Sequence, residues 1–265
     1  MPSELHAARD LAIRVAAEAG ELASAQFGGI VVSRVKDPRG DLVTEVDLAA
    51  ERFVVDSILK AFPHHHVVAE ETGSHGPAGE WVWYADALDG TNNFVLDLPI
   101  YGVCLTLCHD GDPVLAVVHD SHLGRTCWAV RGEGAFEESD RLWLKDPGPP
   151  HLLTASWIQG YEVGPNDETA RAIRRGLESQ FKRVLQTWAP SIDWSLLVRG
   201  RVAAVVAYGE ETEDLLCGVV LCREAGGVVV DLGGQKPSRP FSNGLIAGSP
   251  AATEAVLRSL GRIGS

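Results

Sequence analysis

Apolar residues from Ser3 to Phe27 recur at three- and four-residue steps, the spacing of an amphipathic helix. Gly28-Gly29 then predicts the end of that helix. A second helical pattern begins near Asp47 and ends at Pro63. Between the two helices, the sequence predicts a short β-branched strand at 31–36 and a loop at 37–40.

The chain from 81 to 136 has mainly strand character, with turns at hairpin spacing such as 110–113. An antiparallel sheet is the simplest interpretation. The strands that we expect in this sheet are 81–85, 101–108, 114–119 and 125–130.

After the Pro-Gly-Pro-Pro segment at 147–150, strand-like and helical runs alternate, which is typical of an α/β arrangement. The expected strands are 152–158, 183–187, 202–208 and 227–231, and the expected helices are 167–181, 191–198, 214–225 and 251–260. We therefore predict an α+β subdomain over 1–146 and an α/β subdomain over 151–265. A loop within one domain is the alternative explanation of the 147–150 segment.

Composition narrows the function. The chain has 265 residues, with 23 Lys and Arg against 36 Asp and Glu, and this net charge of −13 argues against binding of nucleic acid through its phosphates. Its five cysteines lie in apolar runs without a Cys-x-x-Cys pair, as expected of reduced thiols in the cytoplasm. No apolar run reaches the ~20 residues that span a bilayer, so we predict no membrane association.

The most informative segment is Asp-Ala-Leu-Asp-Gly-Thr-Asn-Asn-Phe at 86–94. Two carboxylates lie at a predicted strand end, and Gly-Thr-Asn then leads into a predicted helix. Carboxylate oxygens would thus lie beside free backbone N–H groups, an arrangement that suits a metal-bound phosphate. The alternative is that segment 86–94 is only an Asp-rich turn whose side chains cap the following helix.

Further acids occur at Glu70-Glu71 and in Asp-Leu-Val-Thr-Glu-Val-Asp at 41–47. Each is weak evidence alone, because adjacent acids often face solvent and Asp and Thr are ordinary helix caps. Together they suggest one site, because Mg²⁺ takes about six oxygen ligands, including those of a substrate phosphate. Two such ions about 4 Å apart would stabilise both oxygens of an in-line displacement.

In family order and spacing, these blocks resemble the inositol monophosphatase family, the lithium-sensitive, Mg²⁺-dependent phosphomonoesterases related to fructose-1,6-bisphosphatase. The resemblance covers nearly the whole chain, and the matching blocks are Lys36 with 41–47, Glu70-Glu71, 86–94, 131–136, and 214–218 leading to 224–227. It implies a layered α-β-α-β-α sandwich, a homodimer, and two or three Mg²⁺ ions for each site. It also implies hydrolysis of a small phosphorylated alcohol.

The resemblance also assigns roles to residues. It implies that the metal ligands are Glu70, Asp86, the carbonyl of Leu88, Asp89 and Asp214. It implies that Asp41 and Thr91 position and activate the attacking water, with Glu70 as a further catalytic residue. The backbone N–H groups of Gly90 and Thr91 would hold the phosphate. The remaining substrate-binding candidates are Asn92, Trp188 and Asp193.

Departures from the family pattern bear on the substrate. Trp188-Ala189-Pro190 places a bulky ring where many members have small residues. Ala207 stands seven residues before Asp214, where inositol-specific members have a Glu that contacts substrate hydroxyls. We therefore expect turnover of inositol 1-phosphate to fall behind that of another ester, while sugar phosphates, histidinol phosphate and nucleoside monophosphates stay open. A family-typical inositol-1-phosphate phosphatase is the alternative. The nearby carboxylates Glu210, Glu211 and Glu213 could compensate for the missing Glu.

Three other interpretations of this sequence differ in the class of protein that they imply. A haloacid-dehalogenase phosphatase would need Asp-x-Asp-Gly-Thr, whereas Asp86 stands three residues before Asp89. A bisphosphate nucleotidase usually has Glu at the position of Asn93. The third alternative is a binding protein: a relative of these enzymes that binds other proteins and has little turnover. The run His64-His65-His66 is not expected to bind metal, since consecutive side chains diverge.

Overall fold

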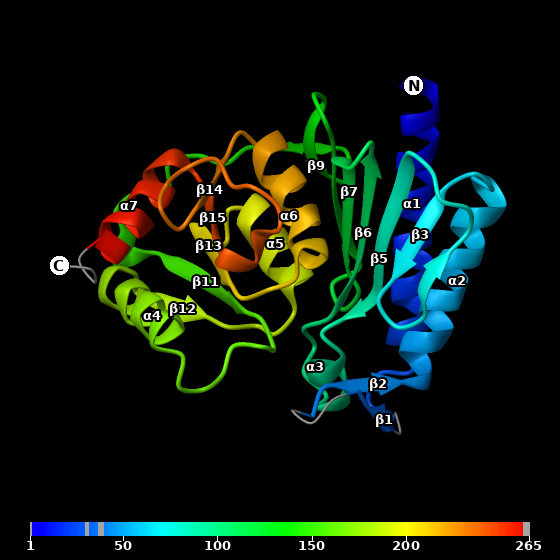
Figure 1. The fold of residues 1–265 in the computed structure, drawn as a ribbon, viewed down its shortest axis with the longest axis horizontal. Helices are drawn as coiled ribbons and strands as arrows, with labels where there is room; N and C mark the ends of the chain where they lie inside the picture. Colours follow the sequence, from blue (N-terminus) through cyan, green and yellow to red (C-terminus); the bar gives the residue numbers. More distant parts are fainter. Residues whose placement is uncertain (1, 30–31, 37–39, 262–265) are drawn as a thin grey trace.

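The computed structural model describes residues 2–29, 32–36 and 40–261. Residue 31 of the first predicted strand and residues 37–39 of the predicted loop lie outside the described residues. Figure 1 shows two large sheets side by side, with helices on their outer faces and between them. A short antiparallel ribbon, β1 (Val32–Val35) with β2 (Leu42–Thr44), lies at one edge.

The larger sheet is built from the first half of the chain. Its eight strands lie in the order β10-β9-β8-β7-β6-β5-β3-β4, and all neighbours are antiparallel except β3 and β5. The strands are β3 (His66–Ala69), β4 (Gly73–His75), β5 (Trp81–Asp89), β6 (Gly102–His109), β7 (Asp112–Asp120), β8 (Arg125–Val130), β9 (Gly134–Glu137) and β10 (Asp140–Leu142).

Helices α1 (Pro2–Ser24) and α2 (Glu45–Ala61) cover the outer face of this sheet, at the right of Figure 1. Their apolar stripes pack with the sheet residues into one core, in which Val15, Val54 and Trp83 are fully buried. Burial of such a stripe is the main stabilisation of an amphipathic helix. Both helices were predicted from their periodicity.

The smaller sheet comes from the second half and has the order β12-β11-β13-β15-β14. Strand β11 is parallel to β12 and β13, whereas β15 is antiparallel to both its neighbours. The strands are β11 (Thr154–Gln159), β12 (Arg183–Leu185), β13 (Ala204–Tyr208), β14 (Val228–Asp231) and β15 (Leu245–Gly248). Helices α4 (Glu168–Gln180) and α7 (Pro250–Gly261) pack on its outer face.

Helices α5 (Pro190–Val198) and α6 (Thr212–Glu224) form the middle layer. One core joins them to residues of both sheets, such as Val118 of β7 and Val205 of β13. All eight residues of 215–222 in α6 are buried, as expected of a helix that is covered on all sides. The layers thus run α-β-α-β-α, which confirms the predicted sandwich.

Several strands were not predicted from the sequence. The prediction omitted β2, β4, β9, β10 and β15, which have only three or four residues each. The strand expected to end at Ala85 continues as β5 to Asp89, through an irregularity in its pairing with β6 between Asp86 and Asp89. This irregularity changes the direction of the side chains that follow Asp86.

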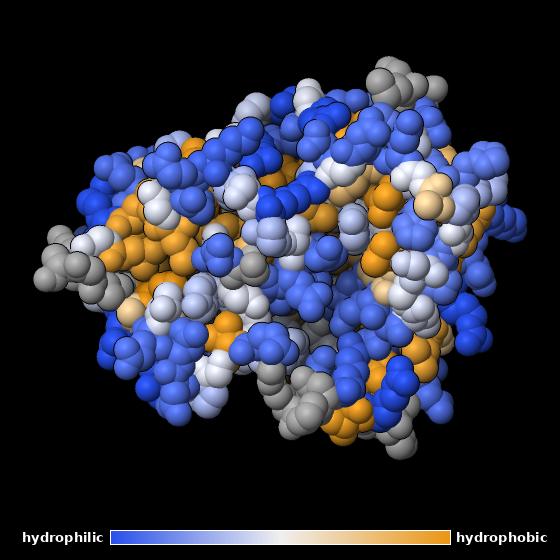
Figure 2. Space-filling view, viewed as in Figure 1, coloured by the Kyte–Doolittle hydropathy of each residue, from blue (hydrophilic) through white to orange (hydrophobic). Residues whose placement is uncertain are grey.

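The face in Figure 2 is mainly hydrophilic, with its largest hydrophobic area at the left, beside α7 of Figure 1. Among the described helices, none has the length and apolar character needed to cross a membrane.

Candidate active site

The predicted acidic segment forms the junction of β5 and the short helix α3 (Thr91–Val95). Gly90 makes the turn with a φ of 91°, a left-handed conformation that favours glycine. A Cβ at this position would lie 2.7 Å from the carbonyl oxygen of Ile100. The turn therefore needs glycine for its conformation and for the close approach of the neighbouring backbone.

A cavity of about 260 Å³ opens over this junction, between the two halves of the chain. The predicted residues that line it are Asp41, Glu70, Asp86, Leu88, Asp89, Gly90, Thr91, Trp188, Asp193 and Asp214. Asn92 is joined to the same region, because its amide donates to Asp41 Oδ1 and to Tyr161 Oη, each at 3.2 Å. The fold thus brings together residues that are up to 173 positions apart, from Asp41 to Asp214.

Three carboxylates converge in the cavity, of which Asp89 is buried and Asp86 and Asp214 are half-buried. Burial raises the pKa of Asp86 and Asp214 well above the usual range, and repulsion from neighbouring acids adds to the shift. Burial raises the pKa of Asp89 to about 7, although hydrogen bonds from Ser191 oppose the shift. The Ser191 backbone N–H donates to Asp89 Oδ2 at 2.6 Å. The charged form of these acids is therefore unfavourable in the absence of a counter-charge, and a bound cation would stabilise it.

Among the described residues that line the cavity, Lys36 is the one lysine or arginine. Its Nζ lies 2.7 Å from Glu70 Oε1, contacts Glu71, and lies 3.7 Å from Asp41 Oδ2. Burial alone would lower the pKa of Lys36, but attraction and hydrogen bonding from Glu70 and Glu71 raise it overall. One ammonium group therefore balances only part of the acidic charge.

The hydroxyl of Thr91 donates to Asp47 Oδ1 at 2.6 Å and lies 3.0 Å from the carbonyl oxygen of Leu88. The family resemblance implies that Asp41 acts with Thr91 on the attacking water. In the structure the Thr91 hydroxyl donates to Asp47, and the role of Asp41 stays a prediction. Asp47 is buried at the start of α2, where it and Thr44 form a reciprocal capping box. The cap holds this carboxylate in one orientation, toward Thr91.

Asp193 is 1% exposed, and both of its carboxylate oxygens accept hydrogen bonds. Ser156 Oγ donates at 2.5 Å and Thr187 Oγ1 at 2.8 Å. Burial raises its pKa to about 7. These contacts tie α5 to β11 and to the segment after β12, so Asp193 supports the loop that carries Trp188. Direct contact of Asp193 with substrate stays a prediction.

Two residues of the site were not singled out by sequence reasoning. Asp47 lay within the motif, and the Thr-x-x-Asp capping pattern could have indicated its fixed position. Tyr161 lies in the loop after β11 and has no local motif that predicts a role. Glu210, one of the acids considered as a substitute, is buried, and this burial raises its pKa.

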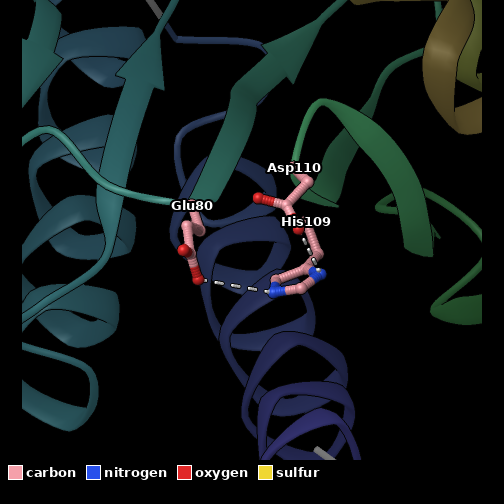
Figure 3. Close-up of side chains that lie close together, drawn as sticks. All are labelled: Glu80, His109 and Asp110. Atoms are coloured by element: carbon pink, nitrogen blue, oxygen red, sulfur yellow. Dashed lines mark ion pairs between the residues drawn. The ribbon is translucent and has the colours of Figure 1, made fainter.

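A separate group of possible metal ligands lies outside the cavity. Glu80, His109 and Asp110 each offer an atom within 4.8 Å of the others (Figure 3). Glu80 pairs with Nε2 of His109 at 3.8 Å, and Asp110 pairs with Nδ1 at 3.6 Å. The carboxylates thus face different ring nitrogens, and both are largely exposed. This geometry is that of a surface ion-pair group.

The donor set of the cavity fits a hard divalent cation. Asp86, Asp89 and Asp214 supply oxygen donors, and Glu70 lies close enough for its charge to raise the pKa of each of them. Mg²⁺ prefers oxygen ligands and keeps several waters, so these carboxylates and the Leu88 carbonyl suit it.

The fold places the chain among proteins of inositol monophosphatase type. The SuhB protein of Bartonella henselae superposes with a TM-score of 0.87 at 23% identity, over 96% of this chain and 98% of that one. The Thermotoga maritima IMPase superposes with a TM-score of 0.83 at 28% identity, over 96% and 98% of the two chains. The first likeness concerns the fold alone.

Sequence comparison then settles the family. The model of the inositol monophosphatase family matches residues 4–265, and the chain therefore belongs to that family. The fructose-1,6-bisphosphatase/inositol-1-monophosphatase of Thermotoga maritima is 31% identical over 242 residues, which cover 89% of this chain and 91% of that protein. The Nus factor SuhB of Escherichia coli K12 is 29% identical over 261 residues, covering 97% and 96%. The resemblance recognised in the sequence is confirmed.

Proposed function

We propose that this protein is a Mg²⁺-dependent phosphomonoesterase that hydrolyses a small phosphorylated alcohol by attack of water on the phosphorus. The convergence of Asp86, Asp89 and Asp214 in one cavity, beside the Gly90 turn, is the observation that carries the proposal. Family membership makes a phosphoric monoester hydrolase the expected class of enzyme.

Different residues of the cavity would bind the metal ions and the phosphate. Asp86, Asp89, Asp214, Glu70 and the Leu88 carbonyl would hold two or three Mg²⁺ ions. When bound, these ions would neutralise charge on the phosphate and acidify a water molecule. The backbone N–H groups of Gly90 and Thr91 would bind phosphate oxygens at the turn.

The Thr91 hydroxyl would orient the attacking water. Its proton is directed to Asp47, 2.6 Å away, which leaves its oxygen lone pairs able to accept a hydrogen bond from water. Burial raises the pKa of Asp47, so this carboxylate is a competent acceptor for a proton passed through Thr91. Asp41, on the same wall, would contribute to substrate positioning together with Asn92.

Phosphate release tests the proposal. The substrates are histidinol phosphate, myo-inositol 1-phosphate, glucose 6-phosphate and adenosine 5′-monophosphate, each with Mg²⁺, with EDTA, and with Mg²⁺ plus Li⁺. We expect release only with Mg²⁺, and inhibition by Li⁺. Release that persists in EDTA would contradict the metal assignment, and no release from any ester would contradict the enzymatic one. We also propose that the protein is a homodimer and that it is located in the cytoplasm. Light scattering on the same sample tests the homodimer.

A protein-binding role is the second candidate, because several relatives of similar identity are named Nus factor SuhB. It would use the surface and not the cavity. An Asp89→Asn variant separates the two roles, because it should lose turnover while retaining any partner that the wild type captures.

A further inference from the structure

The cavity has a second chemical character at its mouth. Tyr161 and Trp188 line it, and each side chain is 42% exposed, although both are large aromatic residues. Their ring centroids lie 5.8 Å apart, with an angle of 36° between the ring planes. The pair therefore presents aromatic surface beside a site whose inner wall is acidic.

Trp188 is held in its position at a cost in backbone energy. Its φ of 55° lies in the left-handed region, which is unusual for a bulky residue. Such strain persists only where surrounding contacts fix it, and it is concentrated at functional sites.

Contacts on both sides of Trp188 provide that fixation. The Asn93 amide donates to the Thr187 carbonyl oxygen at 2.7 Å, and the Thr187 hydroxyl donates to Asp193 at 2.8 Å. On the other side, Ala189 is fully buried against the Gly90 turn. The loop is thus braced by the phosphate-binding segment itself, and the Trp188 side chain remains exposed at the cavity.

Tyr161 is tied to the same segment. Its hydroxyl accepts a hydrogen bond from the amide of Asn92, the residue directly after Thr91. The aromatic pair is therefore joined, through Asn92, to the segment that would bind the phosphate. It lies where we expect the alcohol part of a substrate.

This chemistry favours a flat ring over a polyol. Aromatic faces stack on planar rings, and stacking of a nucleobase contributes about 1–3 kcal/mol per base. A polyol needs hydrogen-bond partners for its hydroxyls, and Ala207 is fully buried in β13 without a polar side chain. The exposed carboxylates of Glu211 and Glu213 on the cavity wall would favour a leaving group without negative charge.

We propose that Tyr161 and Trp188 form a stacking platform that selects phosphate esters whose alcohol carries a planar ring. This inference rests on the proposed phosphatase function, which it narrows from small phosphorylated alcohols to ring-bearing ones. Tyr161 and Trp188 act here as specificity-determining residues.

The first test compares kcat/KM for two planar-ring esters, adenosine 5′-monophosphate and histidinol phosphate, with that for two polyol esters, myo-inositol 1-phosphate and glycerol 3-phosphate. We expect the wild type to prefer the ring-bearing esters at least tenfold. Trp188→Leu and Tyr161→Leu keep apolar volume but lack an aromatic face, and each should reduce the ratio by about 5- to 100-fold. Trp188→Phe and Tyr161→Phe should retain most of it.

Trp143→Leu is the matched control. Trp143 is 55% exposed and does not line the cavity, so its loss should leave the ratio unchanged. A wild-type preference for polyol esters would overturn the proposal, as would an unchanged ratio in both Leu variants.

A binding measurement separates failure of the platform from failure of the phosphatase. Free adenosine, histidinol and myo-inositol are titrated calorimetrically into the wild type and into Trp188→Leu. Tighter binding of the two ring compounds, lost in the variant, supports the platform even where no ester is hydrolysed. Hydrolysis of esters combined with equal binding of all three alcohols would leave the phosphatase intact and refute the platform.

Discussion

The two ends of the cavity are built in different ways. The acidic end lies on regular elements: Asp86 and Asp89 belong to β5, and Asp214 lies in the first turn of α6. The aromatic end lies on loops, with Tyr161 after β11 and Trp188 after β12. Rigid elements hold side chains more accurately, whereas loops accept change without loss of the core. The proposed chemistry would therefore depend on the regular elements of the fold, and the proposed choice of substrate on its loops.

The two ends also carry different energetic costs. At the acidic end the cost is electrostatic, since buried carboxylates of like charge have raised pKa values. At the aromatic end the cost is conformational and falls on the backbone of Trp188. A cation offsets the first cost, and a ligand that stacks on the exposed ring offsets part of the second. In the proposed function, the acidic end would bind the metal ions and the phosphate, and the aromatic end would bind the ring of the alcohol.

The largest expected effect comes from Asp89→Asn, which alters the acidic end alone. Loss of this carboxylate should reduce phosphate release by about 10³-fold or more, because metal binding supplies several kcal/mol of transition-state stabilisation. Folding should persist, since burial already raises the pKa of Asp89 to about 7 and the amide avoids a buried charge. The measurements are kcat with Mg²⁺, the calorimetric affinity for Mg²⁺, and Tm.

Asp56→Asn, on the exposed side of α2, is the control and should match the wild type in all three measurements. Near-normal turnover of Asp89→Asn would contradict the metal-ligand assignment.

The second effect separates Asp47 from Asp41, the carboxylate to which the family resemblance gives a role in activating the water together with Thr91. Asp47→Asn should lower kcat about 10²-fold, since it weakens the acceptor of the Thr91 proton at 2.6 Å. Asp41→Asn should act mainly on KM, because Asp41 bonds to Asn92 at the cavity wall. Steady-state kinetics of the two variants on one substrate provide the comparison. A larger loss of kcat in Asp41→Asn would restore the original assignment.

The sequence predicted the acidic end better than the aromatic end, for a physical reason. Asp86, Asp89 and Gly90 are neighbours in the chain, so their spacing already defines a strand end and a turn. The contact of Thr91 with Asp47 joins residues 44 positions apart. The Thr-x-x-Asp capping pattern fixes the orientation of Asp47 at the start of α2, but it does not show which distant residue that carboxylate faces. The pairing of Tyr161 with Trp188 depends on the placement of two loops by the smaller sheet, which periodicity does not specify.

The same limit applies to the fold. Helices α1 and α2 were predicted because long apolar stripes have a clear period. The short strands β9, β10 and β15 were not, since three or four residues give too little alternation to detect. The middle layer is formed by segments that reach across from the second half of the chain to the first. Its position came from the family resemblance, and the subdomain boundary at 147–150 stays a prediction.

The third effect concerns Gly90, which joins β5 to α3 at the acidic end of the cavity. Gly90→Ala should lower the free energy of unfolding by about 2–3 kcal/mol, because it adds a Cβ to a left-handed backbone in close contact with Ile100. Urea denaturation measures the loss. Gly111 also has a positive φ, of 78°, but its Cβ would meet no atom within 4 Å, so Gly111→Ala reports the conformational part alone. An equal loss in both variants would show that the contact with Ile100 has no cost.

The smallest expected effect is a change in pH dependence beneath the aromatic end. The pKa of Asp193 is raised to about 7 in the folded chain, against about 3.9 in the unfolded one. The folded state therefore binds the proton more tightly, and this carboxyl lowers the free energy of unfolding as pH rises from about 4 to about 7. Asp193→Asn removes that contribution. Urea denaturation at pH 5 and pH 7.5 should show a smaller decrease for the variant, by about 2 kcal/mol, while Asp56→Asn follows the wild type. Equal decreases in wild type and Asp193→Asn would mean that Asp193 is charged throughout, held by Ser156 and Thr187, and that its burial has no pH-dependent cost.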